Sequence, residues 1–471
     1  MKNSVYDVRF KGDKGMTDIS VVLKKQRQFF EKGITKKYEF RMQALSRLEK
    51  ALEEWENDIK EALWKDLHKS PSESYMAEIG LCKSEIKYMK SHLHKWIRPQ
   101  YVPMSLTQFP AKTYRLAEPY GVTLVMAPWN YPVLLCLEPL INAITAGNCV
   151  VLKPSAYAPN VSKVLYDMLK SIYPEEYVAV IEGGREVNQE LLEQRFDYIF
   201  FTGGVSVGKL VLKKAAEHVT PVTLELGGKS PCVVDETADI KMTAKRIVFG
   251  KLLNAGQTCV APDYVIVHKS VKDTLLQALK IQLVKALGKS PLDNKEYPKI
   301  INEQHFKRLQ ELYKNEKIVV GGYANGKTRQ IAPTILDEIT LDSRVMQEEI
   351  FGPILPVLTY ENREELKQII NHFEKPLAFY LFTNSKEMMK WTEQTFSYGG
   401  GCVNDTIIHL ASSHMPFGGV GHSGMGGYHG KVGFETFSHV KSIVRKWRFL
   451  DLPMRYHPYR TWKDKILKAI L

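Results

Sequence analysis

Several marks of common protein classes are missing from this sequence of 471 residues. It has only six cysteines, and no Cys-x-x-Cys pair or other paired spacing among them suggests a disulfide framework or a metal site. They are Cys82, Cys136, Cys149, Cys232, Cys259 and Cys402. We therefore expect free thiols in a reducing, cytoplasmic compartment, and no bound metal.

Targeting and membrane segments are also missing. Residues 1–17 are polar and charged, without the apolar run of a signal peptide, and residues 1–16 resemble a flexible leader. The most apolar stretch, 122–152, is interrupted by residues such as Pro128, Pro139 and Gly147. These breaks favour strand, turn, helix and strand over one membrane span of ~20 apolar residues. We find no internal repeats and no low-complexity tracts.

The length and charge of the chain narrow the remaining classes. A chain of 471 residues exceeds what one hydrophobic core usually supports, so two or more domains are expected. The apolar fraction of 44% is ordinary for a soluble protein, whereas the formal net charge of +13 suggests an anionic partner. A nucleotide cofactor, an acidic substrate or an anionic membrane would fit. Nucleic acid is not an expected partner, because no recognition motif accompanies the charge.

The hydrophobic rhythm predicts an α/β fold. Residues 19–96 have apolar positions at helical spacing, and residues 98–112 are richer in proline and polar residues, as in an extended arm. From Tyr114 onward, short β-like runs alternate with helical ones. Such alternation predicts a parallel sheet covered by helices, with ligands bound beyond the carboxyl ends of the strands. A second α/β pattern follows Glu225.

A cysteine and a glutamate have the sequence context of a covalent catalyst. Cys259 lies in Gly-Gln-Thr-Cys-Val-Ala-Pro, where small residues leave the backbone open around a thiol. Glu225 lies in a strand-like run that ends in two glycines. A thiol nucleophile and a separately placed carboxylate suggest covalent catalysis followed by base-assisted hydrolysis. Taken alone, each would more often be an inert thiol or a strand-edge carboxylate.

Two turns that follow predicted strands add candidates for the same site. In Phe-Thr-Gly-Gly-Val-Ser-Val-Gly, Gly203 and Gly208 would let the backbone approach a phosphate at a helix N-terminus. This stretch lacks both the G-x-G-x-x-G spacing and the P-loop ending, and an ordinary βα turn is about equally favoured. Asn130 lies between Pro128 and Pro132, so its amide is positioned to donate to an oxyanion, although a structural turn is the alternative.

Three further side chains are candidates for holding a nucleotide. Lys153 closes a predicted strand and would point at a bound nucleotide. Glu349 in Glu-Glu-Ile-Phe-Gly-Pro could accept from ribose hydroxyls, and Phe351 could pack on a ring. Taken singly, each charged residue is more often a solvated surface charge.

The order of these motifs resembles the aldehyde dehydrogenase superfamily. The matching motifs are Pro-Trp-Asn at Asn130, Lys-Pro-Ser at Lys153, Phe-Thr-Gly at Gly203, Glu-Leu-Gly-Gly-Lys at Glu225, Gly-Gln-x-Cys at Cys259 and Glu-Glu-x-Phe-Gly-Pro at Glu349. The glycine-rich block 414–430 is similar to the class 3, or fatty aldehyde dehydrogenase, type. The likeness covers nearly everything from about residue 21 to about residue 459.

The resemblance implies a domain plan and a homodimer. Residues 1–97 and 117–224 would form a helical N-terminal part and a Rossmann-like NAD(P) domain. Residues 225–430 would form the catalytic α/β domain, and residues 98–116 and 431–446 a small bridging sheet that joins subunits. Residues 447–471 form a basic tail interleaved with aromatic residues.

The resemblance also implies a role for each site residue. Cys259 would attack the aldehyde carbon, the Asn130 side chain and the Cys259 N–H would stabilise the oxyanion, and Glu225 would activate water to release a carboxylic acid. The residues implied to hold the cofactor are Trp129, Lys153, Ser155, Gly203, Gly208, Glu349 and Phe351. A CoA-acylating enzyme is an alternative, which Glu225 argues against because such relatives generally lack this base. A semialdehyde dehydrogenase with a polar substrate is another.

Three finer expectations follow. Medium or long aliphatic, or aromatic, aldehydes are the expected substrates. Both NAD and NADP are expected as cofactors, because Ala156 stands where many family members carry a glutamate that binds the adenosine ribose. The tail is expected to contact a membrane peripherally, to cover the substrate entrance, or to pack as an ordinary C-terminal helix.

Overall fold

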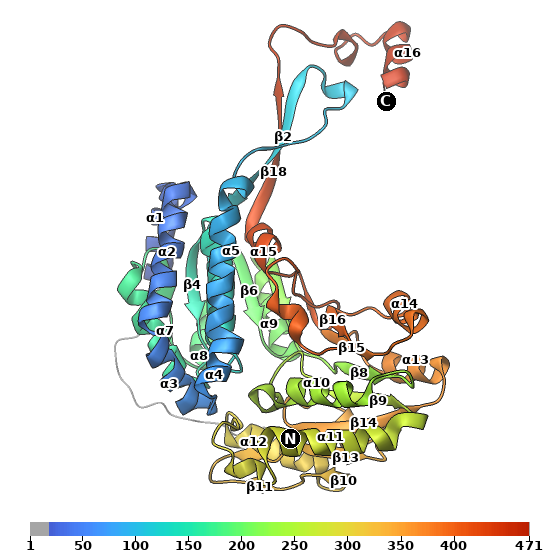
Figure 1. Cartoon of the computed structure of the whole chain (residues 1–471). Coiled ribbons are helices and arrows are strands. Elements are labelled where there is room, and N and C mark those ends of the chain that lie inside the picture. Colours follow the sequence, from blue (N-terminus) through green and yellow to red (C-terminus); the bar gives the residue numbers. More distant parts are fainter. Residues whose placement is uncertain (1–17, 471) are drawn as a thin grey trace, which may run out of the picture.

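The N-terminal part of the chain is a layer of helices in which each helix buries one apolar face. The computed structural model describes residues 18–470, so the leader predicted for residues 1–16 lies outside them. The helices are α1 (Ile19–Glu31), α2 (Tyr38–Glu54), α3 (Glu56–Leu67), α4 (Pro71–Ser74) and α5 (Gly80–Trp96). A five-residue π-helix, Tyr75–Ile79, joins the last two. In Figure 1 these blue helices lie alongside the first sheet.

The first sheet has six strands in the order β17-β7-β6-β3-β4-β5. Their bounds are β3 (Val122–Met126), β4 (Cys149–Lys153), β5 (Val178–Val180), β6 (Tyr198–Thr202), β7 (Val222–Glu225) and β17 (Gly424–Met425). The connecting helices are α6 (Leu134–Ala146), α7 (Pro159–Ile172), α8 (Arg185–Leu192) and α9 (Val205–Ala216). All strands but β17 run parallel. Parallel strands buried on both faces explain why β3 and β4 are buried at every position.

The second sheet has seven strands in the order β10-β13-β14-β9-β8-β15-β16. They are β8 (Pro231–Val234), β9 (Tyr264–His268), β10 (Lys317–Val320), β13 (Thr334–Asp337), β14 (Ile354–Tyr360), β15 (Ala378–Phe382) and β16 (Gly400–Val403). The helices of this part are α10 (Ile240–Leu252), α11 (Lys272–Leu287), α12 (Glu303–Tyr313), α13 (Arg363–Asn371) and α14 (Lys386–Thr395). The last helix before the ribbon, α15 (Gly430–Thr436), packs instead against α5 and α6 of the first part. The short strands β11 (Ala324–Asn325) and β12 (Gln330–Ile331) form a separate antiparallel pair.

A long two-stranded ribbon projects from the body of the molecule (Figure 1). It consists of β2 (Ala111–Pro119) and β18 (Ser438–Lys446), which pair antiparallel over nine residues, with β1 (Gln100–Tyr101) added at the edge of β2. The chain then ends in α16 (Thr461–Ile470), beyond the far end of the ribbon. Several large apolar side chains on this projection are exposed, among them Tyr101, Leu106, Trp447 and Phe449.

The fold class predicted from the sequence, α/β with a Rossmann-like parallel sheet, is confirmed. One connection was not foreseen: β17 comes from the glycine-rich block near the C-terminus and joins the first sheet beside β7. Gly424 is thereby paired with Glu225. Among residues 18–470, no helix combines the length and the apolar character needed to cross a membrane.

Candidate active site

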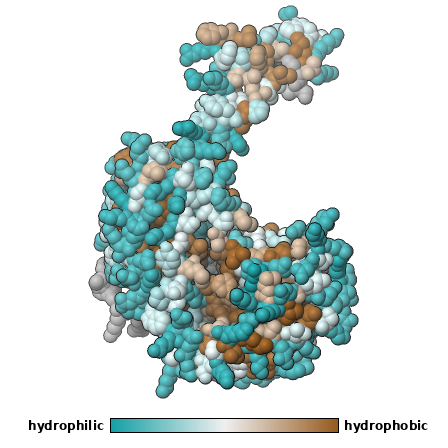
Figure 2. Space-filling model, in the orientation of Figure 1, coloured by the Kyte–Doolittle hydropathy of each residue, from teal (hydrophilic) through white to brown (hydrophobic). Residues whose placement is uncertain are grey.

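A cavity of about 680 Å³ opens where the carboxyl ends of β3, β6 and β7 face the second α/β part. Three strand ends supply Trp129 and Asn130, Gly203, and Glu225 to its wall, and the loop after α10 supplies Cys259. In Figure 2, apolar residues gather in the hollow between the two halves of the body. Adjacent parallel strands end at the same edge, which is why motifs scattered over more than a hundred residues of sequence meet here.

The loop that carries Cys259 has an unusual backbone. Asn254, Ala255 and Gly256 are all in the left-handed region, with φ of 51°, 52° and 72°. A Cβ at Gly256 would lie 2.3 Å from the Gly352 carbonyl oxygen, so only glycine fits. The Cys259 side chain is half-buried on the cavity wall. Burial raises the pKa of this thiol to about 12, and the carboxylates of Glu349 and Glu225 add to the shift.

Glu225, the last residue of β7, is buried with 2% of its surface exposed. Neither carboxyl oxygen has a hydrogen-bond partner within residues 18–470. Burial raises the pKa of Glu225 well above its ordinary value. A carboxyl group without partners, facing a cavity, is free to exchange a proton with a ligand there.

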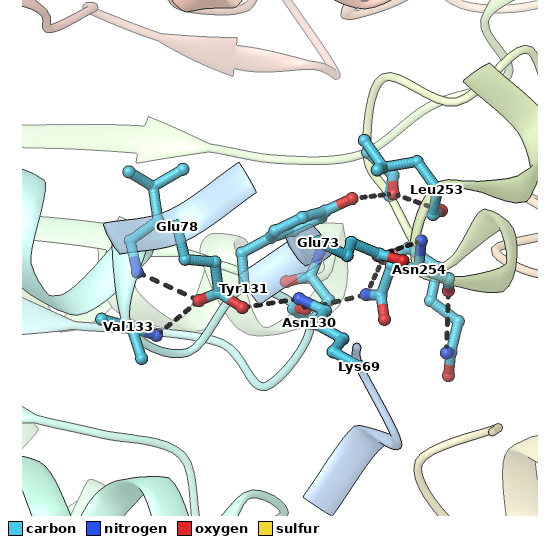
Figure 3. A network of polar contacts seen from close by, with 11 residues as sticks. Lys69, Glu73, Glu78, Asn130, Tyr131, Val133, Leu253 and Asn254 are labelled. Carbon is cyan, nitrogen blue, oxygen red and sulfur yellow. Dashed lines mark hydrogen bonds and ion pairs between the residues drawn. The ribbon is translucent and has the colours of Figure 1, made fainter. Parts of the chain in front are cut away.

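Asn130 is almost fully buried in the loop between β3 and α6, and its residue lines the cavity. Its carbonyl oxygen accepts from Lys69 Nζ and from Asn254 Nδ2, each at 2.8 Å. Figure 3 shows these bonds as part of a polar network that continues to Glu78 and Tyr131. The main chain of Asn130 is thus held at a definite position relative to the Cys259 loop.

Four of the predicted cofactor residues line the same cavity: Trp129, Gly203, Glu349 and Phe351. The rings of Trp129 and Phe351 meet edge to face, with centroids 5.4 Å apart. Burial raises the pKa of Glu349 to about 8. A Cβ at Gly227 would lie 2.2 Å from Glu349 Oε2, so this glycine lets the carboxylate approach the β7 turn.

Three predicted cofactor residues do not line the cavity. Lys153 is buried at the end of β4, where its Nζ donates to the Pro154 carbonyl at 2.7 Å, and burial lowers its pKa to about 8. Ser155 follows at the next turn. Gly208 packs against Leu226, and a Cβ added at Gly208 would lie 2.7 Å from the Leu226 side chain. A Cβ added at Gly204, by contrast, would meet no heavy atom within 4 Å, so the space beside this glycine is open.

The structure adds residues that the sequence analysis missed. Arg308 of α12 donates to the carbonyl oxygens of Glu349, at 3.2 Å, and Ile350, at 2.6 Å, and so holds the loop of Glu349. His305, one turn earlier, lies 5.3 Å from the Trp129 ring. No local pattern in the sequence marks α12 as part of the site, because only tertiary packing brings it there.

A second missed group is a buried pair at the cavity wall. His429 Nε2 lies 3.1 Å from Glu138 Oε1, and both side chains are less than 10% exposed. The nearby Glu85 accepts from the Gly430 N–H, and burial raises its pKa to about 7. Tyr-His-Gly at 428–430 was noted only for its likeness to a subgroup, so its place at this wall is new information from the structure.

A parallel sheet of this topology binds nucleotides beyond the carboxyl ends of its strands, and here that edge opens onto a thiol. The molecule therefore has the architecture of a nucleotide-dependent α/β enzyme. Residues 13–443 match the model of the aldehyde dehydrogenase family, and the chain belongs to that family. As such it oxidises aldehydes to carboxylic acids with NAD or NADP.

Known relatives cover almost the whole chain. The chain is 47% identical to 4,4'-diaponeurosporen-aldehyde dehydrogenase of Staphylococcus aureus, over 94% of this chain and 96% of that protein. It is 41% identical to the dimeric, NADP-preferring aldehyde dehydrogenase of Canis lupus familiaris, over 94% and 98%. A solved structure described as the substrate-bound state of Staphylococcus aureus AldH is 46% identical and has a TM-score of 0.94, over 96% and 99% of the two chains.

Proposed function

We propose that this enzyme acts on medium or long aliphatic, or aromatic, aldehydes. One observation carries the proposal: the cavity wall away from the strand ends is mainly apolar. Its side chains there include Met76, Leu81, Leu134, Leu135, Ile407, Ile408, Leu410 and Phe417. Such a wall favours apolar substrates, because each methylene group removed from water contributes about 0.8 kcal/mol. The S. aureus relative, named for 4,4'-diaponeurosporen-aldehyde, is consistent with this choice.

Three side chains carry the proposed chemistry. Cys259 loses its proton and its sulfur attacks the aldehyde carbon, which turns the carbonyl oxygen into an oxyanion. The Asn130 side-chain amide and the Cys259 N–H donate to that oxyanion, and their placement before the reaction lowers the barrier. A nicotinamide held beside Cys259 would supply the acceptor for the hydride that leaves the former aldehyde carbon. Cys259 then holds the acid as a thioester.

Glu225 completes the cycle in this proposal. It takes a proton from water, whose oxygen attacks the thioester carbon and frees the Cys259 sulfur together with the carboxylic acid. The absence of hydrogen-bond partners on both Glu225 oxygens within residues 18–470 supports this role, since a structural carboxylate would be paired.

The residues present fit a nicotinamide dinucleotide. Helix α9 begins directly after Gly204, whose side-chain position is open, and its first turn holds no acidic residue. This N-terminus would hold the pyrophosphate. Glu349 would accept from the nicotinamide ribose, and Trp129 and Phe351 would enclose that end of the cofactor. Lys153 and Ser155 at the end of β4 and Gly208 of α9 would belong to the outer part of the site.

A chain-length series tests the substrate class. NAD(P)H formation is measured with aldehydes from two to about twelve carbons, with benzaldehyde and with a carboxylate-bearing semialdehyde, each with and without CoA. We expect kcat/KM to rise with chain length and to be independent of CoA. A preference for short polar aldehydes would contradict the proposed class, and acyl-CoA formation would favour the CoA-acylating alternative. Cys259→Ser, expected to form no NADH but still to bind cofactor, is the control.

We also propose the quaternary and cellular setting. The ribbon of β2 and β18 exposes apolar side chains and would join two copies as a homodimer. The canine relative is named as dimeric. The domain limits 1–97 with 117–224, 225–430, and 98–116 with 431–446 are proposed as before, with 447–471 as the tail. We propose a cytoplasmic enzyme, membrane-peripheral only if the tail of α16 binds lipid.

A further inference from the structure

A buried ion pair outside the cavity joins the two loops that carry the proposed chemistry. Lys69 Nζ lies 2.6 Å from Glu78 Oε1, and both side chains are 0% exposed. Lys69 follows α3, and Glu78 lies in the π-helix between α4 and α5. Neither residue belongs to a motif noted in the sequence, and neither lines the cavity.

Each partner of this pair holds the main chain of the Asn130 loop. Lys69 Nζ donates to the Asn130 carbonyl at 2.8 Å. Glu78 Oε2 accepts from the N–H groups of Val133, at 2.8 Å, and Leu134, at 3.2 Å. The loop from Asn130 to the first residue of α6 is therefore anchored at both ends by one pair of charges. A carboxylate at the N-terminus of α6 also meets the positive end of the helix dipole.

The same network of contacts reaches the loop that carries Cys259. The Asn130 carbonyl that Lys69 binds also accepts from Asn254 Nδ2 at 2.8 Å, and Asn254 starts the left-handed turn before Cys259. Lys69 Nζ lies 3.9 Å from the centre of the Tyr131 ring, and the Tyr131 hydroxyl meets Thr258 Oγ1 at 2.7 Å. Figure 3 shows this path from Glu78 through Lys69 to the Asn254 turn.

We propose that Lys69 and Glu78 are positioning residues, which hold the Asn130 amide at the place where the oxyanion forms on Cys259. The argument rests on the proposed role of Asn130 as an oxyanion donor. Burying two charges loses hydration that apolar side chains of the same size would not lose, so stability alone is a poor reason for the pair. The geometry of the pair gives a better reason, because the pair binds the Asn130 loop, which in turn is bonded to the Asn254 turn before Cys259. A π-helical turn aims Glu78 inward, and such turns are frequent at functional sites.

The test replaces both charged side chains and measures hydride transfer, the step that depends on the oxyanion. In Lys69→Met/Glu78→Gln, single-turnover hydride transfer at saturating aldehyde and NAD⁺ is expected to fall roughly 10- to 100-fold, as for a displacement of about 1 Å. The aldehyde KM and the cofactor Kd should stay within about twofold, because the lost interaction acts in the transition state. Alkylation of Cys259 by iodoacetamide creates no oxyanion, so its rate should not fall.

A second ion pair in the same helical layer serves as a control for the change of charge, with side chains that are 27% and 32% exposed. Lys90 of α5 and Glu49 of α2 form a pair at the same 2.6 Å, and neither contacts the Asn130 loop. Lys90→Met/Glu49→Gln should leave hydride transfer unchanged. Lys69→Gln/Glu78→Gln, which leaves no unpaired charge in the interior and keeps polar side chains, should show a smaller fall and serves if the first double variant does not fold.

Two results would overturn the proposal. One is hydride transfer within about twofold of wild type in Lys69→Met/Glu78→Gln and in Lys69→Gln/Glu78→Gln. The other is a fall that alkylation or the Lys90/Glu49 control shares, since that would mean general destabilisation. Asn130→Ala is measured beside them. If it keeps its rate of hydride transfer, the oxyanion role itself fails, which is a different result from failure of the positioning role alone.

Discussion

At the scale of single residues, burial sets the protonation of the site. The pKa of Cys259, Glu225 and Glu349 is raised in each case chiefly by removal from water. The acid form of each group therefore predominates over more of the pH range in the free protein than it would in water. In the roles proposed above, Cys259 as nucleophile and Glu225 as base would therefore gain reactivity as the pH rises.

Glu225→Gln is expected to separate the two halves of the reaction. An amide of the same size cannot take a proton from water, so thioester hydrolysis should slow by on the order of 10²- to 10⁴-fold while hydride transfer changes little. Stopped-flow would show a burst of NADH, and mass spectrometry an acyl group on the protein. Equal loss in both steps would argue against Glu225 as the hydrolytic base.

The same change should remove a pH dependence. Because the pKa of Glu225 is raised, its basic form increases with pH, and decay of the acyl-enzyme in the wild type should speed up with pH. In Glu225→Gln that decay should be nearly flat over the same range. The measurement is acyl-enzyme lifetime after a single turnover, which is independent of the earlier ionisation of Cys259.

The raised pKa of Glu349 predicts how the free energy of unfolding of the cofactor-free protein depends on pH. Its pKa rises from 4.5 to about 8 on folding, so the native state binds more protons than the unfolded state between these values. The contribution of Glu349 to the free energy of unfolding is therefore fully present below about pH 4.5 and is lost as the pH rises through about 8. Glu349→Gln should gain stability relative to wild type between pH 5 and pH 8.5.

Urea unfolding at the two pH values measures this difference. Glu190→Gln, at an exposed position of α8, is the control and should show no such gain. An equal gap between Glu349→Gln and wild type at pH 5 and at pH 8.5 would contradict the prediction.

At the scale of elements, the C-terminal segment after β18 is the most separate part of the chain. In α16, Trp462 is exposed, Ile466 is half-buried, and Lys463 is buried because its Nζ donates to the carbonyls of Tyr456 and Pro458, each at 2.8 Å. The side chain of Ile470 lies outside the described residues.

Deletion of residues 447–471 tests what this segment does. If it contacts lipid, the full chain should co-sediment with vesicles of anionic lipid and the deleted chain should not. If it covers the substrate entrance, deletion should change KM for long aldehydes more than for short ones, with no vesicle binding by either form. Unchanged KM and no vesicle binding would leave only a packing role.

At the scale of the whole molecule, our prediction of cofactor choice concerns two neighbouring strands, β4 and β5, whose ends lie at one edge of the first sheet. Ala156 follows β4, where many family members carry a carboxylate, and Glu182 follows the neighbouring strand β5. The Glu182 carboxylate is close enough to Lys153 to oppose the lowering of the Lys153 pKa by burial. The carboxylate near the end of β4 therefore comes from Glu182, after β5, and not from position 156.

We expect the wild type to use both NAD and NADP, and Ala156→Glu to lower the ratio of kcat/KM for NADP over NAD, because a second carboxylate repels a 2′-phosphate. Glu182→Gln should raise the ratio. Both are measured at one saturating aldehyde, together with the Kd of each cofactor by fluorescence. Strong exclusion of NADP by the wild type, or an unchanged ratio in Ala156→Glu, would refute the idea.

The sequence by itself determined the α/β fold, because strand and helix periods alternate locally, and it pointed to Cys259, Glu225 and Asn130, because short turns with glycine or proline surround them. All three residues line one cavity: Asn130 and Glu225 because parallel strands end at a common edge, and Cys259 because the loop after α10 faces that edge. Lys153 ends β4 and Ser155 follows it at the same edge of the sheet, but neither lines the cavity, which the motif alone does not reveal.

Only the tertiary structure decided which distant segments complete the site. Arg308, the pair of His429 and Glu138, and the pair of Lys69 and Glu78 come from helices and loops far away in the chain and have no local signature. The pairing of β17 with β7, which brings a glycine block beside Glu225, is of the same kind. The physical reason is that local periodicity specifies an element and its buried face, whereas long-range packing and the satisfaction of buried polar groups select its neighbours.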